Sequence, residues 1–509
     1  MHRTQRAEIT PAASAKGSSF ASDLAAFRRA HPGYDPTSTL DELRRREYGR
    51  LDATSQLYLD YAGGGLFAER QLRAHADALA RSVLGNPHSI NPTSLAATQL
   101  VQRARAAVLA HFNASPSEYA VVFTANASAA LRLVGEAYPF GPGGHLLLTA
   151  DNHNSVNGLR EFCRTKRSAH SYVPVDEQEL RLCAEPLRAA LGRYGAKAPR
   201  WSWRGLGRQA SGGRLFAYPA QSNFSGVQHS LTWVVEAQRL GWDVLLDASA
   251  FVPTNRLDLG RVQPDFVTLS FYKMMGYPTG LGCLLARREA LARLRRPWFA
   301  GGAVVAVTVK GDDHRLADAE AGFEDGTVDY LSIPAVDIGL AYLNEVGIEA
   351  IHQRVQSLTT WLLGGLRGLR HSNGLPLVRL YGPINTIARG GIVTFNFLDP
   401  SGRIVDERLV ERLALEHQIS LRTGCFCNPG AAEIAFGIDT GPIGGVFEGQ
   451  QALSYDRYIE GLGLPSAGAI RVSLGVASSF ADVHRFLEIA QGLRDLVPNL
   501  AGLPPRDHC

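Results

Sequence analysis

Two residues, each at or just after the end of an apolar, strand-like run, have the clearest chemical potential in this sequence. Lys273 follows the run PDFVTLS and precedes a glycine-rich stretch, and Asp247 ends the run DVLLD, 26 residues earlier. A lysine amine can form a Schiff base with an aldehyde cofactor, and a buried carboxylate can keep a pyridine nitrogen protonated so that the ring accepts electrons. The pair therefore indicates pyridoxal phosphate chemistry, whereas each residue alone would more often be a surface lysine or a strand-end aspartate.

Three further stretches suit a planar cofactor that carries a phosphate. TANASAAL leaves a strand pattern and opens a helix through small residues, so a phosphate could approach the backbone N–H groups, and Ser128 could add a hydroxyl donor. His153, in DNHNSV, could stack on the ring and carry protons, and Asn223, in QSNFSG, could donate to a ring oxygen. Taken singly, such residues are more often a capped helix start, a surface histidine and a turn asparagine.

A pair of cysteines, Cys425 and Cys427, lies in the glycine-flanked stretch RTGCFCNPG. One interpretation is a nucleophilic thiolate on a loop, where Arg422 would lower the thiol pKa. The alternatives are half of a zinc site, for which a second close Cys/His pair is missing, and two incidental thiols. The chain has six cysteines, too few and too scattered for a disulfide scaffold.

These residues need a scaffold, and the patterns around them predict an α/β fold. Short apolar runs alternate with helical patterns through the middle of the chain, which is typical of a mostly parallel sheet covered on both faces. After about Pro334, long helices, three strand patterns and a final helix follow, as in a smaller α+β domain. Two glycine-rich stretches, 195–213 and 436–468, stand apart from these patterns, and the first suits a surface loop. The predicted organisation is an N-terminal segment (1–56), a large cofactor domain (57–334), a small C-terminal domain (335–500) and a tail (501–509).

Composition narrows the class of protein further. The 509 residues carry a formal net charge of only +4, which does not indicate a nucleic-acid partner or a membrane surface. No apolar run approaches the roughly 18 residues of a spanning helix. The N-terminus has no apolar secretory region, so we expect a cytoplasmic enzyme.

The order of these motifs resembles the cysteine-desulfurase branch of the fold-type I pyridoxal phosphate enzymes, within the class V aminotransferase-like proteins. More closely, it resembles the N-terminal, NifS-like part of molybdenum cofactor sulfurases. The resemblance runs from about Tyr58 to about Leu487, and its specificity comes from four stretches taken together: LLDASAFVPT, SFYK with PTGLG, FEDGT, and RTGCFCN. It implies a large domain with a mostly parallel, seven-stranded sheet and a smaller α+β domain.

The resemblance also implies a role for each matching cofactor residue. Lys273 matches the Schiff-base lysine, with Asp247 at the pyridine nitrogen and His153 stacked on the ring. Asn223 matches the asparagine that contacts the ring hydroxyl and lies beside the substrate. The residues that match the phosphate site are Ala127, Ser128 and Ser270. No metal ion is expected.

Three more matches concern the partner subunit, the substrate and the sulfur. Thr327 matches a threonine that reaches the phosphate of a neighbouring subunit, which implies a homodimer. Arg471 matches the arginine that binds the substrate carboxylate, a role suited to a bidentate guanidinium. Cys427 matches the persulfide-forming cysteine, with Cys425 as a neighbour or relay. The implied reaction takes sulfur from L-cysteine, releases alanine and passes the sulfur to an acceptor.

Some residues differ from the pattern of the iron–sulfur-type desulfurases, and others differ from the pattern of the molybdenum cofactor sulfurases. Ala250 and Tyr272 stand where iron–sulfur-type desulfurases carry glutamine and histidine, which favours the sulfurase branch. The stretch AAEIAFGIDTG differs from the sulfurase pattern, and the C-terminal domain of the eukaryotic sulfurases is expected to be absent. The acceptor therefore stays open between a molybdoenzyme, a sulfur carrier and a biosynthetic pathway. Other activities of the same scaffold also stay open: a C–S lyase, a selenocysteine lyase, an epimerase or an aminotransferase, or a binding partner without turnover.

Overall fold

The computed structural model describes residues 20–195, 212–438 and 468–498, together with five single positions (456, 459, 503, 505 and 506). The two glycine-rich stretches at 195–213 and 436–468 fall largely outside these residues.

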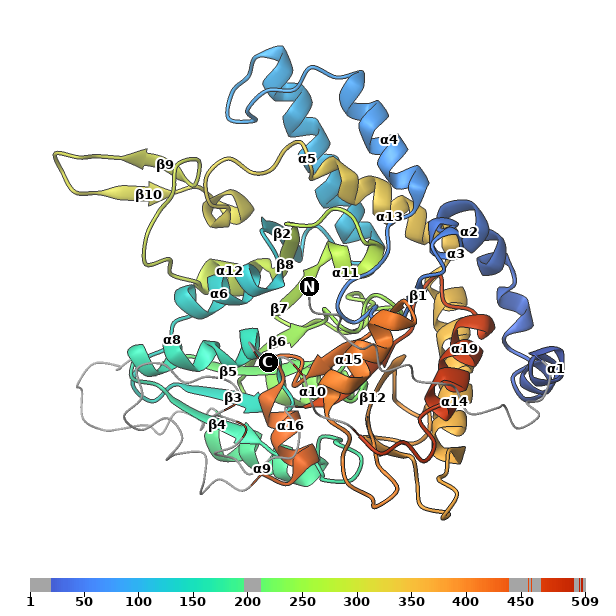
Figure 1. Cartoon of the computed structure of the whole chain (residues 1–509). Coiled ribbons are helices and arrows are strands. Elements are labelled where there is room, and N and C mark those ends of the chain that lie inside the picture. The colour runs from blue at the N-terminus through green and yellow to red at the C-terminus, as the bar shows by residue number, and fades with distance from the viewer. Residues whose placement is uncertain are drawn as a thin grey trace, which may run out of the picture.

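A seven-stranded sheet forms the centre of the larger part of the molecule (Figure 1). Four of its neighbouring pairs are parallel, and β8 runs antiparallel to both of its neighbours. The predicted fold class, α/β with a mostly parallel sheet, is confirmed. In spatial order the strands are β2 (Tyr119–Thr124), β8 (Gly282–Arg287), β7 (Phe266–Ser270), β6 (Asp243–Asp247), β5 (Arg214–Pro219), β3 (His145–Thr149) and β4 (Ala169–Val173).

Helices cover both faces of this sheet, because successive side chains of a strand point to opposite faces. In β3, Leu147 packs into one apolar cluster, whereas Leu146 and Leu148 pack into another. The first cluster lies under α5 (Pro92–His111), α9 (Ala184–Tyr194) and α10 (Thr232–Arg239). The second lies under α6 (Ala127–Ala137), α8 (Leu159–Thr165) and α12 (Arg288–Arg293).

A four-stranded antiparallel sheet lies in the C-terminal part of the chain, which agrees with the α+β pattern of the sequence. Its strands, in spatial order, are β11 (Val378–Tyr381), β12 (Ile392–Phe397), β15 (Ala469–Ser473) and β14 (Arg422–Gly424). The helices of this part are α14 (Ile348–Gly368), α15 (Glu407–Glu416), α16 (Pro429–Phe436) and α19 (Phe480–Gln491). Contacts between α14 and α19 are extensive, and α15 lies over β13 (Ile419–Ser420) and β14.

Two segments cross the predicted domain boundaries, which remain predictions. β1 (Leu57–Tyr58) pairs in parallel with β13, so the chain just after residue 56 joins the C-terminal part. Conversely, α13 (Pro334–Val346) packs against α5 and α4 (Glu69–Ala80) of the larger part. The N-terminal α1 (Phe20–Ala30) contributes Phe27, whose ring contacts those of Trp361 and Phe480.

The remaining elements are short or peripheral. A hairpin projects from the larger part at the upper left of Figure 1, and its strands are β9 (Val304–Val307) and β10 (His314–Leu316). The short helices are α2 (Thr39–Glu47), α3 (Arg50–Ala53), α7 (Asn154–Asn157), α11 (Phe271–Met275), η1 (Asp35–Thr37) and η2 (Ala319–Phe323). Among the described residues, no helix combines the length and apolar character needed to cross a membrane.

Two glycines beside α11 predict a measurable difference in stability. Gly276 and Gly280 share a φ of +72°, but a Cβ at Gly276 would overlap the backbone of Leu66 and Phe67, whereas a Cβ at Gly280 meets no atom within 4 Å. We expect Gly280→Ala to cost about 1 kcal/mol of unfolding free energy. Gly276→Ala should cost about 1–3 kcal/mol more, because the close-packed backbone must move. Urea unfolding of the cofactor-free proteins measures both, and equal losses would contradict the close approach.

Candidate functional site

A cavity of about 360 Å³ lies at the carboxyl ends of β2, β3, β5, β6 and β7. Parallel strands present their carboxyl ends at the same edge of a sheet, where α/β proteins commonly bind ligands. Residues far apart in the sequence therefore meet there. Seven of the predicted site residues line this cavity: Ala127, Ser128, His153, Asn223, Asp247, Ser270 and Lys273.

Lys273 lies in α11, the short helix that follows β7, and is half-buried in the cavity wall. Burial lowers the pKa of Lys273, and the nearby Asp247 carboxylate opposes that shift. Asp247 ends β6, is buried, and accepts a hydrogen bond from the Ser249 backbone N–H (3.0 Å). The cavity wall thus carries an amine whose pKa is lower than that of an ordinary lysine, together with a nearby carboxylate.

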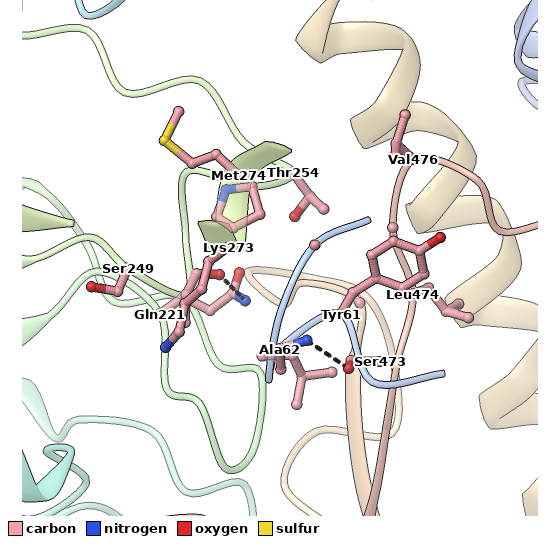
Figure 2. A pocket seen from close by; sticks show the side chains of 16 residues that line it. Tyr61, Ala62, Gln221, Ser249, Thr254, Lys273, Met274, Ser473, Leu474 and Val476 are labelled. Carbon is pink, nitrogen blue, oxygen red and sulfur yellow. Dashed lines mark hydrogen bonds between the residues drawn. The ribbon is translucent and has the colours of Figure 1, made fainter. Parts of the chain in front are cut away.

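A second, much smaller cavity of about 30 Å³ lies against Lys273 as well (Figure 2). Gln221, Ser249 and Lys273 come from the larger part of the molecule, and Tyr61 and Ser473 lie across from them. Lys273 therefore borders two cavities.

The start of α6 forms one end of the larger cavity. The Ala127 N–H donates to Ser270 Oγ (2.9 Å), and the Ser128 and Ser155 hydroxyls are 2.6 Å apart. A Cβ at Gly282 would lie 2.8 Å from the Ala127 nitrogen, so β8 passes this helix start at a distance that only glycine permits. Small side chains and two hydroxyls at a helix N-terminus are suited to a phosphate.

His153 lies at the N-terminus of α7, where its Nδ1 accepts a hydrogen bond from the Ser155 N–H (3.1 Å). Burial lowers the pKa of His153, and the positive charge of Lys273 lowers it further. The imidazole is therefore neutral near pH 7.

Arg471, in β15, is a buried cation beside the cavity. It pairs with Asp60, a residue to which the sequence analysis assigned no role. Arg471 Nη1 donates to the Asn223 carbonyl (3.0 Å), and Arg471 Nη2 donates to Asp60 Oδ1 (3.2 Å). Asp60 also pairs with Arg422 (2.8 Å). The Arg471 Nε is buried without a hydrogen-bond partner. Burial lowers the pKa of Arg471 to about 10, so the guanidinium still carries its charge near neutral pH.

The loop that contains Cys427 lies beside this arginine. Cys427 is a free, exposed cysteine with a φ of +54°, and its carbonyl accepts a hydrogen bond from the Asn154 N–H (2.7 Å). Cys425 is disulfide-bonded, so Cys427 is the free thiol of the pair. The Arg471 guanidinium lies 4.7 Å from the centre of the Phe426 ring of this loop, and Asp60 pairs both with Arg471 and with the expected neighbour of the thiol, Arg422.

Thr327, like Arg471 and Cys427, does not line the cavity that seven of the predicted residues share. Thr327 borders a neighbouring cavity of about 350 Å³ and accepts a hydrogen bond from Asn86 Nδ2 (3.1 Å). The two cavities have Ala125 and Gly280 as common walls. In the part of the chain that the structure describes, no group of His, Cys, Asp or Glu side chains is arranged to hold a metal ion.

Two polar residues around the cavity were missed by the sequence reasoning. Asp60 stands in LDYAGGGLF, a stretch that belongs to the resemblance but received no role. Asn428 directly follows Cys427, is fully buried and caps α16. An asparagine before Pro429 is a sequence signature of a helix start, so this position carried a recognisable signal.

Comparisons with known proteins agree with this geometry. Residues 57–192 and 210–486 match the family model for class-V aminotransferases. The chain is 37% identical to the molybdenum cofactor sulfurase of Bos taurus over 92% of this chain and 54% of that protein. It is 36% identical to that of Arabidopsis thaliana over 90% and 58%, respectively. The chain spans about half the length of the curated relatives that it matches.

Solved structures show the same fold. A cysteine desulfurase from Thermococcus onnurineus NA1 superimposes with a TM-score of 0.71 at 22% identity, covering 89% of this chain and 97% of that chain. The cysteine desulfurase CsdA from Escherichia coli gives a TM-score of 0.66 at 20% identity, covering 90% and 99%.

Proposed function

Because this chain belongs to the class-V aminotransferase family, we propose that it is a pyridoxal-phosphate-dependent cysteine desulfurase of the molybdenum cofactor sulfurase type. In the proposed reaction, L-cysteine and the Cys427 thiol become alanine and a Cys427 persulfide. The carbon–sulfur bond of the substrate breaks, and a sulfur–sulfur bond forms at Cys427. The observation that carries the proposal is a free, exposed thiol on a loop that is hydrogen-bonded to Asn223, which lines the cavity of Lys273.

The residues of the larger cavity fit pyridoxal phosphate. A half-buried lysine is available for the aldehyde, a buried carboxylate for the pyridine nitrogen, and a glycine-lined helix start for the phosphate. The volume is in the range of small-molecule sites. When bound, the cofactor supplies an electron sink that stabilises negative charge at the α-carbon of an amino acid.

The side chains around the cavity have complementary tasks in this proposal. Lys273 and His153 are bases in their neutral forms, and either can hold the proton removed from the substrate. Arg471 binds the substrate carboxylate, and Asn223 orients the cofactor ring. The cofactor phosphate is held by Ala127, Ser128 and Ser270. The nucleophile is the Cys427 thiol, on a loop whose Phe426 ring lies against the Arg471 guanidinium.

The Arg471 role predicts a selective effect on substrate binding. We expect Arg471→Lys to raise KM for L-cysteine about tenfold to a hundredfold, because an ammonium cannot make the bidentate contact. The fold should persist, since Asp60 keeps Arg422 as its partner. Steady-state kinetics measures this KM. The control is Arg412→Lys, which changes an exposed arginine of α15. An unchanged KM would remove Arg471 from the substrate site.

The pKa of His153 predicts the acid side of the pH profile. Since this pKa is lowered, the imidazole stays neutral down to a pH below its usual value of about 6.5. We expect kcat/KM to stay level from pH 8 to 7 and to fall only at a pH below about 6.5. His153→Asn, which retains an acceptor for the Ser155 N–H, should lower kcat/KM about 10²-fold or more. Full activity of that variant would contradict the role.

A homodimer, a cytoplasmic location and a sulfur acceptor complete the proposal. The cavity beside Thr327 shares two walls with the cofactor cavity, which supports a second copy whose threonine reaches the phosphate. The acceptor is a protein or cofactor that takes the persulfide sulfur.

The direct test is a product assay. Purified protein is incubated with pyridoxal phosphate and L-cysteine, alanine is measured by chromatography, and the mass of the Cys427 peptide is measured before reduction. Equal amounts of alanine and persulfide in a single turnover are expected. Pyruvate with free sulfide would instead indicate a C–S lyase.

A further inference from the structure

Asn428 is fully buried directly behind the exposed Cys427, and both ends of its side-chain amide are used. Its Oδ1 accepts a hydrogen bond from the Ala431 N–H (3.2 Å) and so caps α16. Its Nδ2 donates to the Asp151 carbonyl (2.7 Å) and to Asn223 Oδ1 (2.9 Å). These two donations tie the Cys427 loop to the segments after β3 and β5, which carry the cofactor residues His153 and Asn223.

The contact with Asn428 fixes which way the Asn223 amide points. Asn223 Nδ2 donates to the Phe426 carbonyl (2.7 Å), and an amide nitrogen has a second N–H that can point into the cavity. A flipped Asn223 would set its NH₂ group against that of Asn428, and its oxygen against the Phe426 carbonyl. Asn428 and the Phe426 carbonyl therefore hold the Asn223 amide in one of its two orientations, with its oxygen against Asn428.

The rest of the loop is bound to the same network. The Asn154 N–H donates to the Cys427 carbonyl (2.7 Å), and the Arg471 guanidinium lies 4.7 Å from the centre of the buried Phe426 ring. Arg471 Nη1 also donates to the Asn223 carbonyl (3.0 Å). The loop, the carboxylate-binding arginine and the ring-contacting asparagine are thus one buried, hydrogen-bonded unit.

We propose that Asn428 is a positioning residue that holds the Cys427 loop against the cofactor cavity and keeps the Asn223 amide donor directed at the cofactor ring. Its effect on the loop is a property of the protein alone. Its effect on the ring rests on the proposed function, because Asn223 contacts the ring only when pyridoxal phosphate is bound.

Asn428→Asp tests this with little change in shape. Aspartate keeps the acceptor that caps α16, but it places an oxygen against the Asp151 carbonyl and Asn223 Oδ1. In the cofactor-free protein at pH 8, we expect amide hydrogen exchange in 423–431 to speed up about tenfold or more. The dissociation constant for pyridoxal phosphate should rise about tenfold, and kcat for L-cysteine should fall more than KM changes. Asn428→Ser, which also keeps a cap acceptor, should act in the same direction.

Asn373→Asp is the matched control, since Asn373 also accepts a backbone N–H and donates to a carbonyl, but on an exposed turn. It should leave both measurements unchanged. Unchanged exchange in 423–431 in both Asn428 variants would overturn the proposal, and so would an equal rise in β12, which would indicate general destabilisation. Wild-type protein that binds no pyridoxal phosphate would refute the proposed function, whereas the exchange result would still decide the loop contact.

Discussion

Cys427→Ser is expected to reduce alanine formation from L-cysteine at least about 10³-fold, because a serine hydroxyl cannot take a sulfur atom as a persulfide. Cofactor binding should be unchanged, since Cys427 is exposed and its contact with Asn154 uses the backbone carbonyl. The left-handed backbone at this position is equally accessible to serine, so stability should change by no more than about 0.5 kcal/mol. Single-turnover alanine formation and the mass of the 423–431 peptide measure both halves of the prediction.

Cys183 offers a matched control for the Cys427 variant. It is another free thiol, half-buried at the start of α9 and absent from the residues that line the described cavities. Cys183→Ser should therefore keep wild-type turnover and persulfide yield. If Cys427→Ser also kept its turnover, sulfur would leave the substrate without Cys427. The thiol-independent lyase reaction on the same scaffold would then be the better account.

Seven residues that the sequence singled out line one cavity because each of them ends or follows a strand of the central sheet. Asp247 and Lys273 come at the ends of apolar strands, and strands that run parallel bring those ends together without further information. The patterns of apolar residues repeat within a few positions of the chain. The sheet and its two layers of helices could therefore be predicted from them.

The contacts that hold the loop and the arginine could not be predicted in the same way. Asp60 meets Arg471 across 411 residues of chain, and Asn428 meets Asn223 across 205. Such pairs depend on how the two parts of the molecule pack, and no local period encodes that packing. Arg422 illustrates the consequence. Its closeness in sequence to Cys427 indicated an electrostatic partner for the thiol, but no local pattern indicated that Asp60 pairs with that arginine and with Arg471 as well.

Lys273→Ala is expected to abolish covalent retention of pyridoxal phosphate and to lower turnover at least about 10³-fold. In the wild-type protein, borohydride reduction should leave the cofactor on the peptide that contains Lys273. In the variant, gel filtration should remove the cofactor, because the cavity then holds it only by non-covalent contacts. Lys310→Ala, which removes an exposed lysine, should retain both properties.

The lowered pKa of Lys273 predicts the direction in which the pH midpoint for covalent attachment shifts. Burial disfavours the ammonium form, so at a given pH more of the amine is neutral and able to attack the aldehyde than in an exposed lysine. The midpoint for covalent attachment, followed by borohydride trapping from pH 6 to 11, should lie below the usual lysine value of about 10.4. Removing the Asp247 charge with Asp247→Asn should move that midpoint lower still, because the carboxylate is the neighbour that stabilises the ammonium form. A midpoint at the usual lysine value would show that the amine is solvated, and Lys273 would then lose the activation on which its role in the cavity depends.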